Sequence, residues 1–303
     1  MSWGRADSRD YITPFSIFEA SDVPPDFELP PNLPREFTGL FLPQDGGWFG
    51  LRRFPPRILI HAEGSVWIVP RQTMRYTRIP VDQLEILECG RILLLGWIGL
   101  QWEGGAETLP YNRHAATTVE RFLDRLKVLW LGQTPALTQS EARAYYAEPD
   151  LKFGYAQAAE MPRQERVAVQ FFHQSACLTK RRLGLRRQTR SPGDLVILSD
   201  WRLLWITERH KAQYEPYGTV SRSAPIGAIQ DIRFGLTEGK ANLECLLRSG
   251  TVWRVVLNDG EEGAARLFAE NAIRLAHGDS APAPPDCSKD SLHHVHHFTE
   301  TRL

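Results

Sequence analysis

The feature that most constrains the fold of this 303-residue chain is an internal repeat. The tetrapeptide Gly-Leu-Arg-Arg occurs at residues 50–53 and again at residues 184–187. Four residues can match by chance, so the match has meaning only if its flanks repeat as well. They do, because residues 58–67 (ILIHAEGSVW) and residues 196–205 (VILSDWRLLW) both carry aliphatic residues, a polar turn and an aromatic in the same order.

Further matches follow in the same order in both halves. The stretch IPVDQL at residues 79–84 matches APIGAI at residues 224–229, and a hairpin pattern comes next in each half. In the second half, alternating apolar residues over 243–257 flank an Arg-Ser-Gly turn, and in the first half a Glu-Gly-Gly turn at residues 103–105 takes the corresponding place. The repeat therefore predicts a unit of about 95 residues that the chain builds twice.

Each unit is predicted to end in one amphipathic helix. Over residues 119–130, apolar residues recur at i, i+3, i+4 and i+7, the stripe of a helix that packs on a core. The second helix is predicted to begin at Asp259, with Glu262 three residues later as a capping-box signature, and to stop at Gly278.

Duplication makes a geometric prediction. The two units should superpose with Phe122 over Phe268 and with Trp67 over Trp205. Each half should also keep its own sheets, because a single sheet through both halves would contradict two separate modules.

Charge and cysteine content limit the class of protein. Lys+Arg and Asp+Glu both number 36, so no global field draws the chain to nucleic acid or to an acidic membrane, and any electrostatic function must be local. The four cysteines are too far apart for a CxxC pair, which argues against zinc knuckles and a dense disulfide framework. The N-terminus lacks the apolar segment of a signal peptide, and the longest apolar run is about half a membrane span. We expect a cytoplasmic protein that is not transmembrane.

The ends of the chain differ in composition from the repeated units. Residues 21–34 are acidic and rich in proline, and after residue 277 the sequence has almost nothing to bury. Ser140 is a candidate cap for a short helix through Ala147 in the connection between the units. The predicted divisions are a Pro-rich acidic lead (1–35), a first domain (36–132), a partly helical linker (133–163), a second domain (164–278) and a disordered histidine-containing tail (279–303).

Short strands closed by one C-terminal helix resemble the pleckstrin-homology-like (PH-like) superfold, in the form seen in many bacterial domains. Residues 203–207 (LLWIT), after Asp-Trp-Arg at 200–202, look like the family's strand that follows a polar-x-Arg turn, and residues 224–229 are similar to its I-P-L-x-x-I strand. The resemblance implies a mainly β fold of two tandem PH-like barrels or sandwiches, each closed by a C-terminal α-helix.

The resemblance also implies a function, which is the binding of lipid headgroups or peptides. We therefore expect a non-enzymatic binding or scaffolding protein, without cofactor or metal, that acts on a protein partner or at an anionic membrane surface. The alternative is an enzyme or a nucleic-acid binder whose site carries no recognisable motif, and the balanced charge makes nucleic acid the weaker candidate. The sequence does not indicate an oligomeric state.

The strongest local charge feature is the basic run LTKRRLGLRRQTR at residues 178–190. Lys and Arg suit phosphate and carboxylate because they offer several charge-assisted donors. Arg186 and Arg187 have counterparts in Arg52 and Arg53, which indicates a shared structural role in addition to a place in the candidate anion site. Four cations occur only in the second unit and are the better candidates for binding an anion or a partner: Lys180, Arg181, Arg182 and Arg190. An ordinary solvated basic face is the alternative.

Three other patterns have ordinary interpretations. The run HHVHH at residues 293–297 would make a weak, adventitious metal site in a disordered tail. His61 and Glu63 match half of a zinc-deaminase motif, but no P-C-x-x-C follows. The apolar stretch at 91–103 is predicted to form a buried strand pair, with Trp97 and Trp102 filling the interior of a barrel.

Overall fold

A computed structural model describes residues 12–43, 54–71, 75–92, 95–132, 149–162, 164–175, 177–182, 185–190, 192–208, 218–237 and 239–278. For residues 177–182 and 185–190 the backbone alone is described.

In the first half, the elements are β1 (Phe15–Ile17), η2 (Ala20–Asp22), β2 (Thr38–Leu42), β3 (Arg57–Ala62), β4 (Ser65–Pro70), β5 (Thr77–Pro80), η4 (Val81–Gln83), β6 (Leu84–Ile92), β7 (Leu95–Trp102), β8 (Gly105–Asn112), η5 (Arg113–Ala115) and α1 (Ala116–Leu131). In the second half they are α2 (Leu151–Glu160), β9 (Val167–His173), β10 (Cys177–Arg182), β11 (Leu185–Arg190), β12 (Asp194–Ser199), β13 (Arg202–Glu208), β14 (Thr219–Pro225), η6 (Ile226–Ala228), β15 (Ile229–Thr237), β16 (Lys240–Leu247), β17 (Val252–Val256) and α3 (Glu262–His277).

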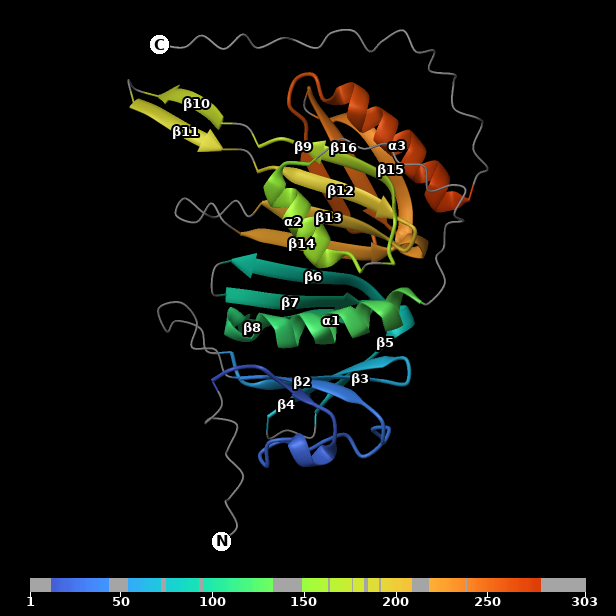
Figure 1. Ribbon diagram of the computed structural model, residues 1–303. Helices are drawn as coiled ribbons and strands as arrows, with labels where there is room; N and C mark the ends of the chain where they lie inside the picture. The colour runs from blue at the N-terminus through green and yellow to red at the C-terminus, as the bar shows by residue number, and fades with distance from the viewer. Residues whose placement is uncertain are drawn as a thin grey trace, which may run out of the picture.

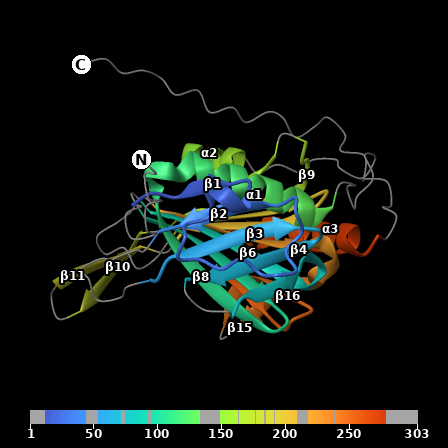
Figure 2. The same ribbon diagram turned by 90° about the horizontal axis from the view of Figure 1, so that it is seen from below.

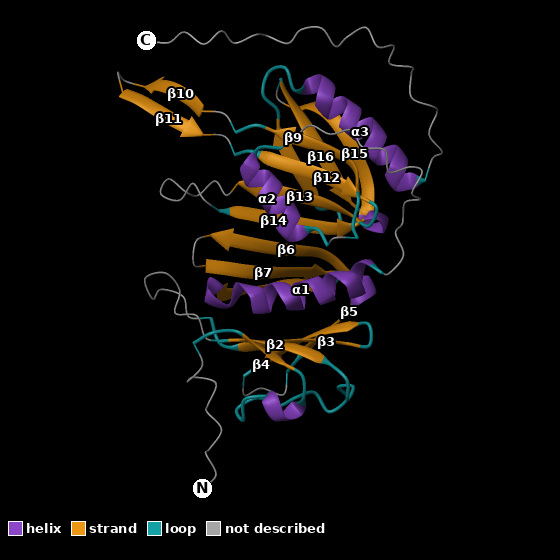
Figure 3. Cartoon of the chain, viewed as in Figure 1, coloured by secondary structure: helices purple, strands orange, loops and turns teal. Residues whose placement is uncertain are grey.

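The two halves repeat one order of elements (Figures 1 and 3). β2, β3, β4 and β5 correspond to β9, β12, β13 and β14, and a 3₁₀ turn follows in each half. Three antiparallel strands come next, β6–β8 in the first half and β15–β17 in the second, and a 16-residue helix ends each half. The prediction of a mainly β chain with helices is confirmed, as are the hairpin turns between β7 and β8 and between β16 and β17. None of the described sheets closes into a barrel.

One seven-stranded antiparallel sheet runs through both halves, in the order β8-β7-β6-β14-β13-β12-β9 (Figure 1). Its central joint is the pairing of β6 with β14, where Glu88 lies opposite Arg222 and Cys89 lies opposite Ser221. The expectation that each half keeps its own sheets is therefore wrong. The physical reason is that β6 and β14 would otherwise be open edges, and their pairing satisfies the backbone groups of both strands.

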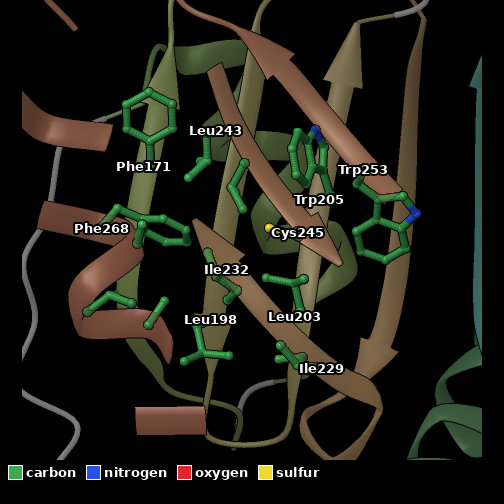
Figure 4. Packing of buried hydrophobic residues seen from close by; sticks show 14 of the residues in the cluster. Phe171, Leu198, Leu203, Trp205, Ile229, Ile232, Leu243, Cys245, Trp253 and Phe268 are labelled. Atoms are coloured by element: carbon green, nitrogen blue, oxygen red, sulfur yellow. The ribbon is translucent and has the colours of Figure 1, made fainter. Parts of the chain in front are cut away.

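The helices that end the two halves pack in two separate cores. In the second half, α3 contributes Phe268 to a cluster that also holds Trp205 of β13 and Trp253 of β17 (Figure 4). In the first half, α1 contributes Phe122 to a cluster built on β2–β8. Both phenylalanines are the seventh residue of a 16-residue helix and both are buried, with 3% and 4% exposed, so their equivalence is confirmed.

The predicted superposition of the two tryptophans is wrong by one residue. The turn after Ala62 corresponds to the turn after Ser199, so Trp67 corresponds to Leu204 and not to Trp205. A slip of one residue moves a strand side chain to the other face of its sheet. Trp67 accordingly packs on the face away from α1, whereas Trp205 lies inside the second core.

In each half, the sheet face that is turned away from the closing helix is covered by a segment outside the repeat. In the first half, the acidic lead is not a free extension, because β1 pairs with β2 and Val23 and Phe27 pack with Trp67. In the second half, α2 covers β12 and β13 through Phe153, which packs on Leu204. As a result, β3 and β4 in the first half and β12 and β13 in the second half are buried on both faces.

The helix ends differ from the sequence prediction at two places. Gly278 ends α3 with a left-handed backbone as predicted, but the helix starts at Glu262, and the capping-box residue Asp259 lies outside it. In the predicted linker, α2 begins after Asp150, whose side chain accepts a hydrogen bond from the backbone N–H of Phe153. The predicted helix from Ser140 to Ala147 lies outside the described residues.

Buried charges lie beside the joint between the halves. The Arg202 guanidinium on β13 donates two 2.8 Å hydrogen bonds to the carboxylate of Glu165, and both side chains are fully buried. The Glu160 carboxylate at the end of α2 contacts Lys127 of α1 at 2.8 Å and Arg91 of β6 at 3.0 Å. Burial by itself would raise the pKa of Glu160, but Lys127 and Arg91 outweigh it and lower this pKa to about 2.

Truncation of the equivalent phenylalanines should destabilise the protein. Phe268→Ala and Phe122→Ala each remove a large apolar group from a packed core, so each should reduce the free energy of unfolding by about 3–5 kcal/mol in urea melts. Leu267→Ala is the matched control, because Leu267 is the neighbour of Phe268 and is 45% exposed. Equal losses for Phe268→Ala and Leu267→Ala would contradict the assignment.

The Glu160 network should make stability depend on pH in acid. The folded-state pKa of Glu160 is depressed, so its contribution is present above its ordinary value of 4.5 and is lost as the pH falls toward about 2. Across that window we expect the free energy of unfolding of the wild type to fall more steeply than that of Glu160→Gln. The variant should also be the less stable protein at pH 7, because Lys127 would stay buried without a counter-charge. Parallel pH profiles for the two proteins would refute this role.

Candidate functional site

The predicted site residues lie on a hairpin that stands apart from the other sheets. β10 and β11 form a two-stranded antiparallel sheet of their own, inserted between β9 and β12. Figures 1 and 2 both show this hairpin extending away from the rest of the molecule. A two-stranded ribbon by itself cannot bury a core.

The register of the hairpin sets like charges opposite each other. Lys180 pairs with Arg187, and the next pair is Arg181 with Arg186. The two pairs follow each other along the ladder, so four cationic residues occupy consecutive paired positions of the ribbon. Like charges directly opposite each other in a sheet are destabilising.

The hairpin register also brings together two groups of cations to which the sequence analysis gave different roles. The sequence assigned Arg186 and Arg187 a structural role shared with Arg52 and Arg53, but residues 51–53 lie outside the described part of the chain. The hairpin places Arg186 and Arg187 beside the cations that are unique to the second half. Arg182 pairs with Leu185 near the tip of the hairpin, and Arg190 pairs with Cys177 at its base. The six predicted residues therefore lie on one ribbon, over its whole length.

A groove of about 340 Å³ lies at the junction of the two halves, and sequence reasoning missed it. Its floor is the face of β6–β8 that continues the core-facing side of β14. Four residues that pair from strand to strand cross this floor, one each from β14, β6, β7 and β8: Arg222, Glu88, Gly99 and Thr108. Its wall is formed by Thr251 and by the first two residues of β17, Val252 and Trp253. The groove combines small floor residues with a salt bridge of 2.8 Å between Glu88 and Arg222.

Trp97 lies on the same sheet face as the groove, so its predicted place in a barrel interior is wrong. Strand alternation buries Ile98 and Leu100 in the first core, which puts Trp97 on the opposite face. There its ring lies against Gly90, where a Cβ atom would overlap it, and its indole Nε1–H donates a 2.7 Å hydrogen bond to Glu88. Trp102 packs on the edge of the first core, as a partly buried residue.

The motifs of metal chemistry do not assemble among the described residues. His61 is half-buried on β3 beside Phe122, and burial, with a smaller effect of Arg125, lowers its pKa, which keeps the ring neutral near pH 7. Glu63 lies in the turn that follows. Across the described ranges, no three His, Cys, Asp or Glu side chains are grouped as a metal site would require. Residues 293–297 lie outside those ranges.

The two cysteines whose side chains are described are buried free thiols, Cys89 in the first half and Cys245 in the second. Burial, reinforced by the Glu160 carboxylate, raises the pKa of Cys89 to about 12. Burial also raises the pKa of Cys245. Because the thiolate is the reactive form, neither cysteine has the environment of a nucleophile.

A scan against protein-family models and a search of curated proteins found no match to this chain. Among the helices that the structure describes, none combines the length and the apolar composition needed to cross a bilayer.

Proposed function

We propose that this protein is a non-enzymatic binding protein, built from two fused PH-like units, that holds an anionic ligand on the β10–β11 hairpin. The ligand class is phosphate or carboxylate displayed on a surface, either lipid headgroups or an acidic peptide. The observation that carries the proposal is the pair of opposed like charges, Lys180 with Arg187 and Arg181 with Arg186. An isolated ribbon with this register is stabilised by an anion that bridges the strands.

The repeated order of elements supports the PH-like part of the proposal. Each half runs through four antiparallel strands, a 3₁₀ turn, three antiparallel strands and a helix. The hairpin lies between the first and second strands of its unit, where the PH-like resemblance places headgroup-binding residues. The fused sheet departs from that resemblance, and it leaves the hairpin itself free of other described strands.

Charge removal on the hairpin should weaken binding and leave the fold intact. We expect a variant with glutamine at Lys180, Arg181, Arg186 and Arg187 to bind phosphatidylserine vesicles at least about tenfold more weakly than the wild type, since each cation near an anionic surface contributes about 1 kcal/mol. Its thermal transition should not fall, because the substitution removes like-charge repulsion. Vesicle co-sedimentation beside a melting curve measures both.

The matched control removes the same charge from exposed cations elsewhere in the structure, with glutamine at Arg121, Arg125, Lys240 and Arg248. Equal binding by the hairpin variant and this control would overturn the proposal. Binding of polyglutamate, measured beside binding of the vesicles, distinguishes an acidic peptide from lipid headgroups as the ligand. Tighter binding of a short DNA duplex than of either would transfer the site to nucleic acid.

A further inference from the structure

The sheet β15-β16-β17 ends at β17, and the other side of β17 pairs with none of the described strands. Backbone hydrogen bonds of 2.9 Å join β16 to the residues that flank β17. The Thr251 carbonyl accepts from the Leu247 N–H, and the Leu257 N–H donates to the Ala241 carbonyl. Bonded pairs alternate along an antiparallel ladder, so the odd-numbered residues of this strand bond inward. The backbone groups of Val252, Arg254 and Val256 point to the open side.

A row of alternating charge crosses the outer face of the same sheet and stops at that edge. Arg233 on β15 lies opposite Glu244 on β16, and Glu244 lies opposite Arg254 on β17. The Glu244 carboxylate contacts Arg233 at 2.9 Å and Arg254 at 2.6 Å. The row therefore reads plus, minus, plus, and the next position beyond β17 would complete the alternation with a carboxylate.

The surroundings of Arg254 fit an added strand on both faces. On the outer face, Val252 and Val256 flank Arg254 and are 45% and 48% exposed, so apolar side chains opposite them would bury more area. On the other face, the open edge borders the groove between β17 and β6–β8. Its small and polar floor, which includes Gly99 and Thr108, leaves room for the alternate side chains of a strand.

We infer that the open edge of β17 binds an extended acidic segment of a partner protein as an added antiparallel strand. The segment carries a carboxylate opposite Arg254 and apolar side chains two residues to either side. Only another backbone in extended form can pair with the row of outward N–H and C=O groups. A second copy fits poorly, because two β17 strands paired about this centre would set Arg254 against its own copy. The inference does not rest on the hairpin site.

The probe is a blocked peptide, Thr-Val-Thr-Glu-Thr-Val-Thr, and its partner for comparison carries lysine in place of glutamate. Fluorescence anisotropy should show that the wild type binds the glutamate peptide about tenfold more tightly than the lysine peptide, since reversal exchanges an opposed pair for a repulsive one. Arg254→Glu should reverse this preference. Equal affinity of the wild type for both peptides would overturn the inference.

Backbone pairing is tested by Val252→Pro, which removes an outward donor and leaves the inward bonds of β17 in place. It should weaken the glutamate peptide by at least about fivefold. Val252→Thr keeps the N–H group and should bind as the wild type does. A melting curve for each variant confirms that the fold is retained. Unchanged binding by a folded Val252→Pro variant would refute strand addition.

Amide hydrogen exchange gives a readout at single residues. In the presence of the glutamate peptide, the amides of Val252, Arg254 and Val256 should be protected, whereas those of Trp253 and Val255 are protected by β16 in either state. Protection without this alternation would contradict the proposed register. A dimer in sedimentation that Val252→Pro dissociates would assign the edge to a second copy and overturn the inference.

Discussion

The pairing of β6 with β14 is the contact on which the arrangement of the two halves depends. It joins three strands of the first half to four of the second, and Ile86 of β6 packs in the core of the second half. The charged side chains beside this joint must find their partners when it forms, because an unpaired buried charge costs several kcal/mol. Lys127, Glu160 and Arg91 come from α1, α2 and β6, so this arrangement of the three elements satisfies all three charges.

Fusion also creates surfaces that neither unit would have alone. The face of β6–β8 that continues under β17 becomes the floor of the groove only because β14 holds β6 in place. The Glu88–Arg222 salt bridge, which crosses the joint, lies in that floor. In two separate units the same face would be open on the first unit, and β17 would be an edge without a groove beside it. The groove is therefore a consequence of the joint.

Local sequence patterns predicted the strands and helices, whereas strand pairing between distant parts of the chain determines how they combine. Alternation at Leu243–Leu257 and the helical stripe around Phe122 predicted strands and a helix correctly, because each signal is contained in a few neighbouring residues. Nothing local marks β6 as the partner of β14, since the two strands are separated by more than a hundred residues. The mistaken match of Trp67 to Trp205 has a similar cause, because aromatic identity outweighed the turn that fixes the register.

The basic run was visible in the sequence, but its geometry was not. Composition marked the cations, whereas the opposition of Lys180 to Arg187 follows only from the hairpin register. The row Arg233–Glu244–Arg254 had no sequence signal, because its three members come from three strands.

The two proposed sites would also respond differently to salt. A basic ribbon that binds an anion would lose affinity as salt screens its charges, whereas a strand added to β17 would draw much of its affinity from backbone hydrogen bonds. A partner that uses both sites would first be attracted by charge and then be held by strand pairing, so salt would reduce its association rate more than it would raise its dissociation rate.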